Sequence, residues 1–220
     1  MTLSSILANL IDNELSWREA ELSHAKIQLQ RSIGAGIEFR YAYRCFAALT
    51  YAHYEGFTKA ILSQALDDIR LSTVKISCCV PLMRNISVAP VARKASFALS
   101  NEQFINAILQ GAAYVDTLPL PDAEIISDCS NLDISNLRWA VSMIGLDPNL
   151  FIESKRSIGR LVNLRHKCAH GELLTFDQFK SEKDLASEMF SLQADITLFM
   201  HNISVCLIDH MSNDKYIELN

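Results

Sequence analysis

The sequence from Ser157 to Glu172 reads SIGRLVNLRHKCAHGE, and its residue pattern predicts an amphipathic helix. On a helical wheel at about 100° per residue, the apolar side chains form one stripe. Arg165 falls inside this stripe, although a guanidinium stays charged and is costly to bury without a partner. We therefore expect Arg165 to point into a seam where an anion or a second subunit meets it. The apolar stripe consists of Ile158, Leu161, Val162, Cys168 and Ala169.

His170 stands immediately before Gly171, the residue type most often found just past the end of a helix. Histidine accepts and releases protons near neutral pH. Arg165 and His170 thus form an Arg-x4-His pair of one permanent cation and one proton-transfer group. The spacing also fits a structural interpretation, because an arginine can pair with a carboxylate and a histidine can complement the helix dipole.

The run from Arg165 to Gly171, RHKCAHG, resembles the motif of HEPN-domain ribonucleases, in which Arg is followed by a polar residue, three further residues and His. His166 occupies the polar position, where Asn is commonest in that family. Other parts of the chain resemble the MAE-like HEPN branch: ELSWRE at 14–19, YAHYEGFTK at 51–59, and the segment 130–146 that precedes the catalytic helix.

The resemblance implies an all-α, HEPN-like antiparallel helical bundle that acts as an endoribonuclease. It also implies a homodimer in which two motifs face each other across a shared, composite active site. Such nucleases act as toxins or defence effectors, often restrained by an antitoxin or another neighbouring-gene partner. By the same resemblance, Tyr51 and Glu55 are candidates for substrate contacts beside the cleft.

The chemistry of RNA cleavage suits these residue types. The 2′-hydroxyl of RNA is the nucleophile, so cleavage needs one proton removed there and one delivered to the leaving 5′-oxygen. We predict that His170 is the acid or base, that Arg165 stabilises the phosphorane charge, and that His166 orients them or assists proton transfer. No metal and no cofactor is expected.

The predicted catalytic helix carries further cations on the face away from its apolar stripe. Arg160 and Lys167 are candidate phosphate contacts, although a solvated charged face is the simpler interpretation. The chain as a whole has a net charge of −5 and a pI near 5.7, which argues against indiscriminate coating of nucleic acid. Any RNA site is therefore expected to be a local basic cleft.

Composition limits the remaining possibilities. At 220 residues, half of them hydrophobic, the chain is sufficient for one domain with an insertion. Its six cysteines show neither C-x-x-C pairs nor zinc-type spacing, so we expect reduced and mostly buried thiols. No apolar run approaches the ~20 residues that cross a bilayer, and no signal pattern opens the chain, so we expect a cytoplasmic protein.

Hydrophobic spacing predicts one helical domain over 1–211 and a polar, frayed tail over 212–220. Two long helices form a hairpin with glycines at its turn, and 72–128 is a probable insertion of irregular, partly helical structure with a short helix at 101–114. The expected long helices cover residues 3–30, 38–69, 133–144, 148–170 and 181–211.

Two other functions remain open at this point. A bundle with the same motif could be a non-catalytic module that binds nucleotide, RNA or a partner protein, or it could be a metal-dependent hydrolase. Away from the motif, structural interpretations are favoured: His53 as a hydrogen-bonded core histidine, Glu55 with Lys59 as a helical ion pair, and His201 and His210 as ordinary surface or core histidines.

Overall fold

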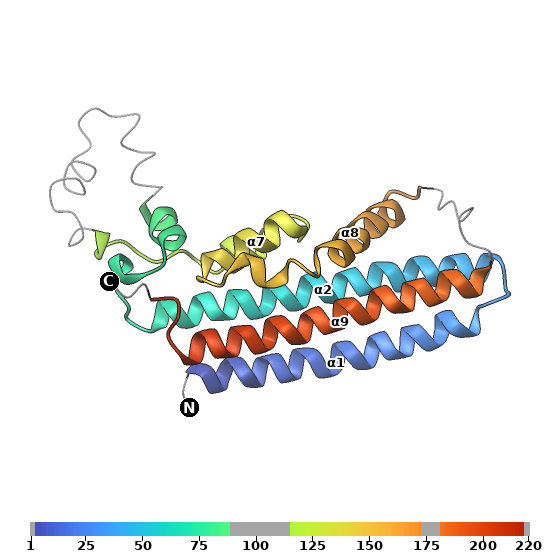
Figure 1. Ribbon diagram of the computed structural model, residues 1–220, viewed down its shortest axis with the longest axis horizontal. Coiled ribbons are helices and arrows are strands. Elements are labelled where there is room, and N and C mark those ends of the chain that lie inside the picture. The colour runs from blue at the N-terminus through green and yellow to red at the C-terminus, as the bar shows by residue number, and fades with distance from the viewer. Residues whose placement is uncertain (1–2, 89–114, 173–180, 218–220) are drawn as a thin grey trace.

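The structure is a computed structural model that describes residues 3–88, 115–172 and 181–217. Three long helices lie side by side along the molecule: α1 (Leu3–Arg31), α2 (Ile37–Leu71) and α9 (Glu182–Ser212) (Figure 1). Helices α2 and α9 both run opposite to α1, and the α1–α2 turn is made by Gly34 and Gly36 in the left-handed region at φ of 91° and 62°. The predicted all-α bundle is confirmed.

Two shorter helices, α7 (Ile134–Met143) and α8 (Lys155–Ala169), lie along α2 on the side away from α1 (Figure 1). The Asp133 carboxylate caps α7 by accepting hydrogen bonds from two main-chain N–H groups. The helix that carries the motif was expected to begin at Pro148, but α8 begins at Lys155. Pro148–Phe151 is a separate 3-10 turn, η2, which places the Phe151 ring 5.5 Å from that of Phe199 in the core.

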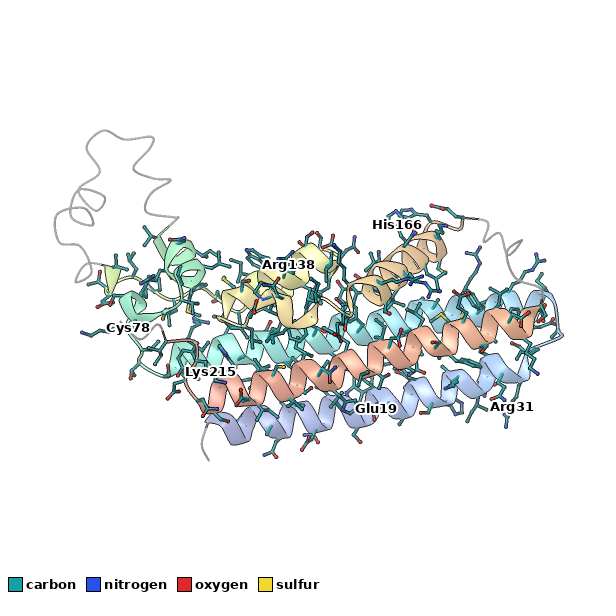
Figure 2. The ribbon with its side chains drawn as sticks, in the orientation of Figure 1. Glu19, Arg31, Cys78, Arg138, His166 and Lys215 are labelled. Atoms are coloured by element: carbon teal, nitrogen blue, oxygen red, sulfur yellow. The ribbon has the colours of Figure 1, made fainter. Side chains whose placement is uncertain are left out.

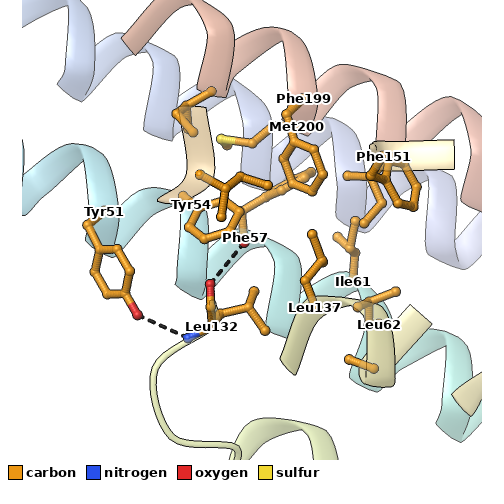
Figure 3. Packing of buried hydrophobic residues seen from close by; sticks show 14 of the residues in the cluster. Tyr51, Tyr54, Phe57, Ile61, Leu62, Leu132, Leu137, Phe151, Phe199 and Met200 are labelled. Carbon is orange, nitrogen blue, oxygen red and sulfur yellow. Dashed lines mark hydrogen bonds between the residues drawn. The ribbon is translucent and has the colours of Figure 1, made fainter. Parts of the chain in front are cut away.

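The core fills the space between the three long helices and continues between α2, α9 and the α7–α8 layer. Tyr54 and Phe57 on α2 meet Phe199 and Met200 on α9, and Leu137 on α7 closes this cluster (Figure 3). The Tyr54 and Phe199 rings lie edge to face at 5.5 Å, a favoured aromatic geometry. Helix α2 is thus buried on several sides and supports the α8 surface described below.

The expected insertion is described only in part. Residues 72–88 contain the 3-10 turn η1 (Ile76–Cys78) and a helical stretch at 81–88, and residues 115–128 contain the short helix α6 (Glu124–Ser127). The predicted helix at 101–114 lies outside the described residues. The described parts agree with an irregular, partly helical segment.

Two expectations about exposure were wrong. The chain end is not frayed through residue 217, because Tyr216 is buried and Ile217 makes an antiparallel bridge to Cys79. The thiols are not mostly buried either, since of the six cysteines only Cys79 is, while Cys45 is exposed. Cys45 lies outward because α8 covers α2 only incompletely along that face.

Helix α9 meets the length and composition criteria for a membrane-spanning helix, with a mean hydropathy of 1.2 over its most apolar window. This helix contains no long continuous apolar run, because polar residues interrupt the apolar ones at helical spacing. The buried side of α9 packs against α1 and α2, and the central helix of a bundle has the same composition.

Candidate functional site

The carboxyl end of α8 is fixed by a Schellman turn around His170. The Glu172 N–H donates to the Lys167 carbonyl at 3.0 Å, and the Gly171 N–H donates to the Cys168 carbonyl at 3.3 Å. Gly171 has φ of +67°, a conformation that favours glycine. The predicted helix end is therefore present, and His170 is held at the C-cap position that follows Ala169.

The two motif histidines lie together in solvent. The His166 and His170 rings have their centroids 4.2 Å apart, and both side chains are exposed. Figure 2 shows His166 on the outer end of α8, away from the three-helix layer. An exposed ring pair is accessible to a ligand from outside the protomer.

Arg165 lies on a different side of α8 from the histidine pair. Its guanidinium carbon is 4.9 Å from the centre of the Tyr51 ring on α2, a cation–π arrangement. The side chain is half-buried, because the apolar stripe that buries Ile158 and Leu161 fades toward the end of α8. The expected seam is therefore a surface groove beside α2.

Tyr51 is itself held in place by main-chain hydrogen bonding. Its hydroxyl accepts a hydrogen bond from the Leu132 N–H at 3.0 Å, while the Tyr54 hydroxyl donates to the Leu132 carbonyl at 3.0 Å (Figure 3). Burial, reinforced by the nearby Glu55 charge, raises the pKa of Tyr51 to about 12. Tyr51 is therefore a neutral, fixed ring beneath Arg165.

A groove of about 430 Å³ runs between α2 and α8, and we call it the α2–α8 groove. Arg165 lines it, whereas His166 and His170 lie beyond its lining at the helix end. Two further residues that were not predicted, Arg44 and Tyr41, line the groove from α2. The sequence shows that both lie on the same predicted helix as Tyr51, but only the fold shows which face of α2 meets α8. The lining consists of Tyr41, Arg44, Cys45, Ala48, Tyr51, Ala52, Glu55, Arg165, Cys168 and Ala169.

The remaining predicted substrate residues are divided between two surfaces. Tyr51 and Glu55 line the α2–α8 groove, and Glu55 also pairs with Lys59 at 3.2 Å, as predicted. Arg160 does not join them: it forms an ion pair with Glu188 on α9 and lines a separate concavity with Arg156 and Asn163. Its position on the wheel gave no sign that α9 would pass beside it. Lys167 is exposed near the histidine pair.

A second arginine–histidine cluster lies between α1 and α2. The Arg18 guanidinium donates to Glu14 at 2.6 Å and lies 3.3 Å from Nδ1 of His53, whose Nε2 is 2.9 Å from the Glu21 carboxylate. Arg18 and His53 are buried, and burial, partly offset by Glu21, lowers the pKa of His53. The core interpretation of His53 is confirmed, whereas the burial of Arg18 was not foreseen.

Carboxylate partners distinguish the two clusters. Across residues 3–88, 115–172 and 181–217, neither Arg165, His166 nor His170 forms an ion pair with Asp or Glu. His201 pairs with Glu19 on the surface, and His210 bonds the Ile144 carbonyl at 2.7 Å, so both have structural contacts. The same described ranges contain no group of three His, Cys, Asp or Glu side chains arranged to hold a metal ion.

Comparison with known proteins gives one positive result. The sequence matches the family model described as MAE_28990-like HEPN over residues 7–216. No curated protein and no solved structure matches the chain. The match covers the helices described above, apart from the first four residues of α1, and the motif at the end of α8.

Proposed function

Because this chain belongs to the MAE_28990-like HEPN family, we propose that it is a metal-independent endoribonuclease that uses Arg165 and His170. The observation that carries the proposal is the end of α8. There an arginine and a histidine pair are accessible, and no carboxylate of the described residues neutralises them. A permanent cation left without a counter-ion is suited to an anionic substrate.

In the proposed reaction, a histidine removes the proton from the 2′-hydroxyl, and the 2′-oxygen attacks the neighbouring phosphorus. The P–O5′ bond breaks, and the leaving oxygen takes a proton from a second histidine. The products are a 2′,3′-cyclic phosphate and a free 5′-hydroxyl. Arg165 stabilises the charge that develops on the phosphorane oxygens.

Two proton transfers need two groups, and the proposal supplies them from a homodimer. His170 of each protomer would face the other across a composite site, with His166 orienting its ring or sharing the proton. The separation of Arg165 from the histidines within one protomer supports this arrangement, because a second copy can place its histidine beside the first copy's arginine. Biologically, we propose a toxin or defence effector restrained by a partner protein.

The proposal is tested by incubating the purified protein with end-labelled single-stranded RNA in EDTA. We expect cleavage with 2′,3′-cyclic phosphate ends, and a loss of at least about 100-fold in rate for both Arg165→Ala and His170→Ala. Arg156→Ala, which removes a cation from the same helix outside the motif, is the matched control. Circular dichroism and sedimentation should show an unchanged fold and oligomeric state for each variant.

Three outcomes contradict the proposal. A double variant that cuts RNA as fast as the parent removes Arg165 and His170 from the mechanism. Cleavage that disappears in EDTA indicates a metal-dependent hydrolase. Saturable binding of RNA or nucleotide without any cleavage identifies a non-catalytic binding module.

A further inference from the structure

We infer that the α2–α8 groove binds one nucleotide of single-stranded RNA, with Arg44 on its phosphate and Tyr41 stacked on its base. The inference deepens the proposed function and rests on it for the choice of RNA. It assigns a role to two residues of α2 that the catalytic motif does not include. The groove volume of about 430 Å³ lies within the range of small-ligand sites.

The charge of the groove differs in sign from that of the chain. Two arginines and one glutamate line it, which gives a local charge of +1 against a chain total of −5. Glu55 is moreover paired with Lys59 at 3.2 Å, so its charge is partly compensated. An acidic protein that gathers cations in one concave surface attracts phosphate to that surface in preference to others.

Arg44 connects the groove to the end of α8. Its Nη2 donates to the carbonyl of Glu172, the last residue of the turn that holds His170. A guanidinium has five N–H donors, and this bond uses one of them. The remaining donors can bind phosphate oxygens while the first keeps the guanidinium beside the proposed reaction centre.

Tyr41 presents an aromatic ring that the fold does not use for packing. Its side chain is 72% exposed, although aromatic rings of this size are normally at least half buried. The groove floor beside it is made of small side chains, Ala48 and Ala52. An exposed aromatic ring beside small side chains and an arginine is the arrangement on which proteins stack the bases of single-stranded nucleic acid.

Binding is measured by fluorescence anisotropy with a labelled ten-nucleotide single-stranded RNA on the full chain carrying His170→Ala, which removes cleavage. In that background we expect Tyr41→Ala to weaken binding at least about fivefold. We expect Arg44→Gln to weaken it and to reduce the salt slope by about 0.7, the value for one phosphate on a single strand. Arg40→Ala, an exposed arginine one turn away that does not line the groove, is the matched control.

An RNA with abasic positions separates the base contact from the phosphate contact. With this RNA, Tyr41→Ala should no longer weaken binding, because the base is absent, whereas Arg44→Gln should still weaken it. The inference is overturned if both variants bind RNA as Arg40→Ala does, or if duplex RNA binds as tightly as the single strand. Because this assay measures binding, its result is separable from the nuclease proposal. A parent that cuts RNA while both variants bind normally refutes the groove alone, and a parent that never cuts while both variants lose binding refutes the nuclease alone.

Discussion

The chain contains two arginine–histidine clusters whose surroundings are opposite. Arg18 and His53 lie buried between α1 and α2, each beside a carboxylate. Arg165 and His170 lie at the accessible end of α8, with no carboxylate partner in the described parts of the chain. Among the described residues, the same two residue types therefore occur once beside carboxylate partners and once without them.

The difference teaches that residue type alone does not mark a functional site. A buried guanidinium is tolerated only when hydrogen bonds and opposite charge replace its water, as Glu14 does for Arg18. The Arg18 guanidinium also lies 4.3 Å from the Trp17 ring, and its Nη1 would be 3.2 Å from a Cβ placed on Gly56. Such a site is closely packed and offers nothing to a ligand, in contrast to the end of α8.

The largest effect on stability is expected from Arg18→Met. Removing one member of a buried, hydrogen-bonded charge cluster leaves Glu14 without its partner, so the free energy of unfolding should fall by about 3 kcal/mol. Arg165→Met loses only a cation–π contact and should cost less than about 1 kcal/mol. Urea denaturation followed by circular dichroism measures both.

In the RNA assay the order of the two variants should be reversed: the variant that loses more stability should lose less cleavage activity. Arg18→Met should retain cleavage at a temperature where it remains folded, whereas Arg165→Met should not. If the two variants lose equal stability, the proposed difference between a structural Arg18 cluster and a functional Arg165 site is wrong.

A smaller effect is expected on the pH dependence of stability. Burial lowers the pKa of both His53 and His210 in the folded protein, with Arg18 beside His53 acting in the same direction and Glu21 opposing it. Below about pH 6.5 the unfolded chain then binds more protons than the folded chain. The contribution that these neutral histidines make to the free energy of unfolding is therefore fully present above that pH, and it is lost as the pH falls below it.

Urea titrations at about pH 7.5 and pH 5.5 measure this slope, which cannot exceed about 1.4 kcal/mol per pH unit for each group. The drop should shrink in a variant carrying both His53→Gln and His210→Gln. A parent that becomes more stable on acidification over this range would show that the buried histidines gain protons on folding.

The smallest effect is expected for Arg160→Ala. Its ion pair with Glu188 is solvent-exposed, and such pairs contribute less than about 1 kcal/mol. If Arg160 is a phosphate contact and its face of the helix is not merely solvated, the variant should lower the salt slope of RNA binding without changing the cleavage rate of bound RNA. An unchanged slope would limit the RNA surface to the motif and the α2–α8 groove.

Most of the helical layout was predictable, because apolar spacing and helix-end residues act locally. Asp133 and Gly171 mark their helix ends as expected. The 3-10 turn at Pro148–Phe151 was not predictable, because it depends on where Phe151 meets Phe199. The site was only half predictable for a similar reason: the motif lies in one helix, but Arg44 and Tyr41 join it through packing between α2 and α8.

One consequence follows from the way Tyr51 and Tyr54 hold Leu132. Two tyrosine hydroxyls from α2 form hydrogen bonds with the main-chain N–H and carbonyl of Leu132. The segment that leads into α7 therefore cannot slide along α2 without breaking both hydrogen bonds together. A displacement of the start of α7, by a docked protein or a substitution, would therefore strain the hydrogen bond between the Leu132 N–H and the Tyr51 hydroxyl. Because the Arg165 guanidinium lies 4.9 Å from the centre of the Tyr51 ring, the position of this arginine depends on a contact outside its own helix.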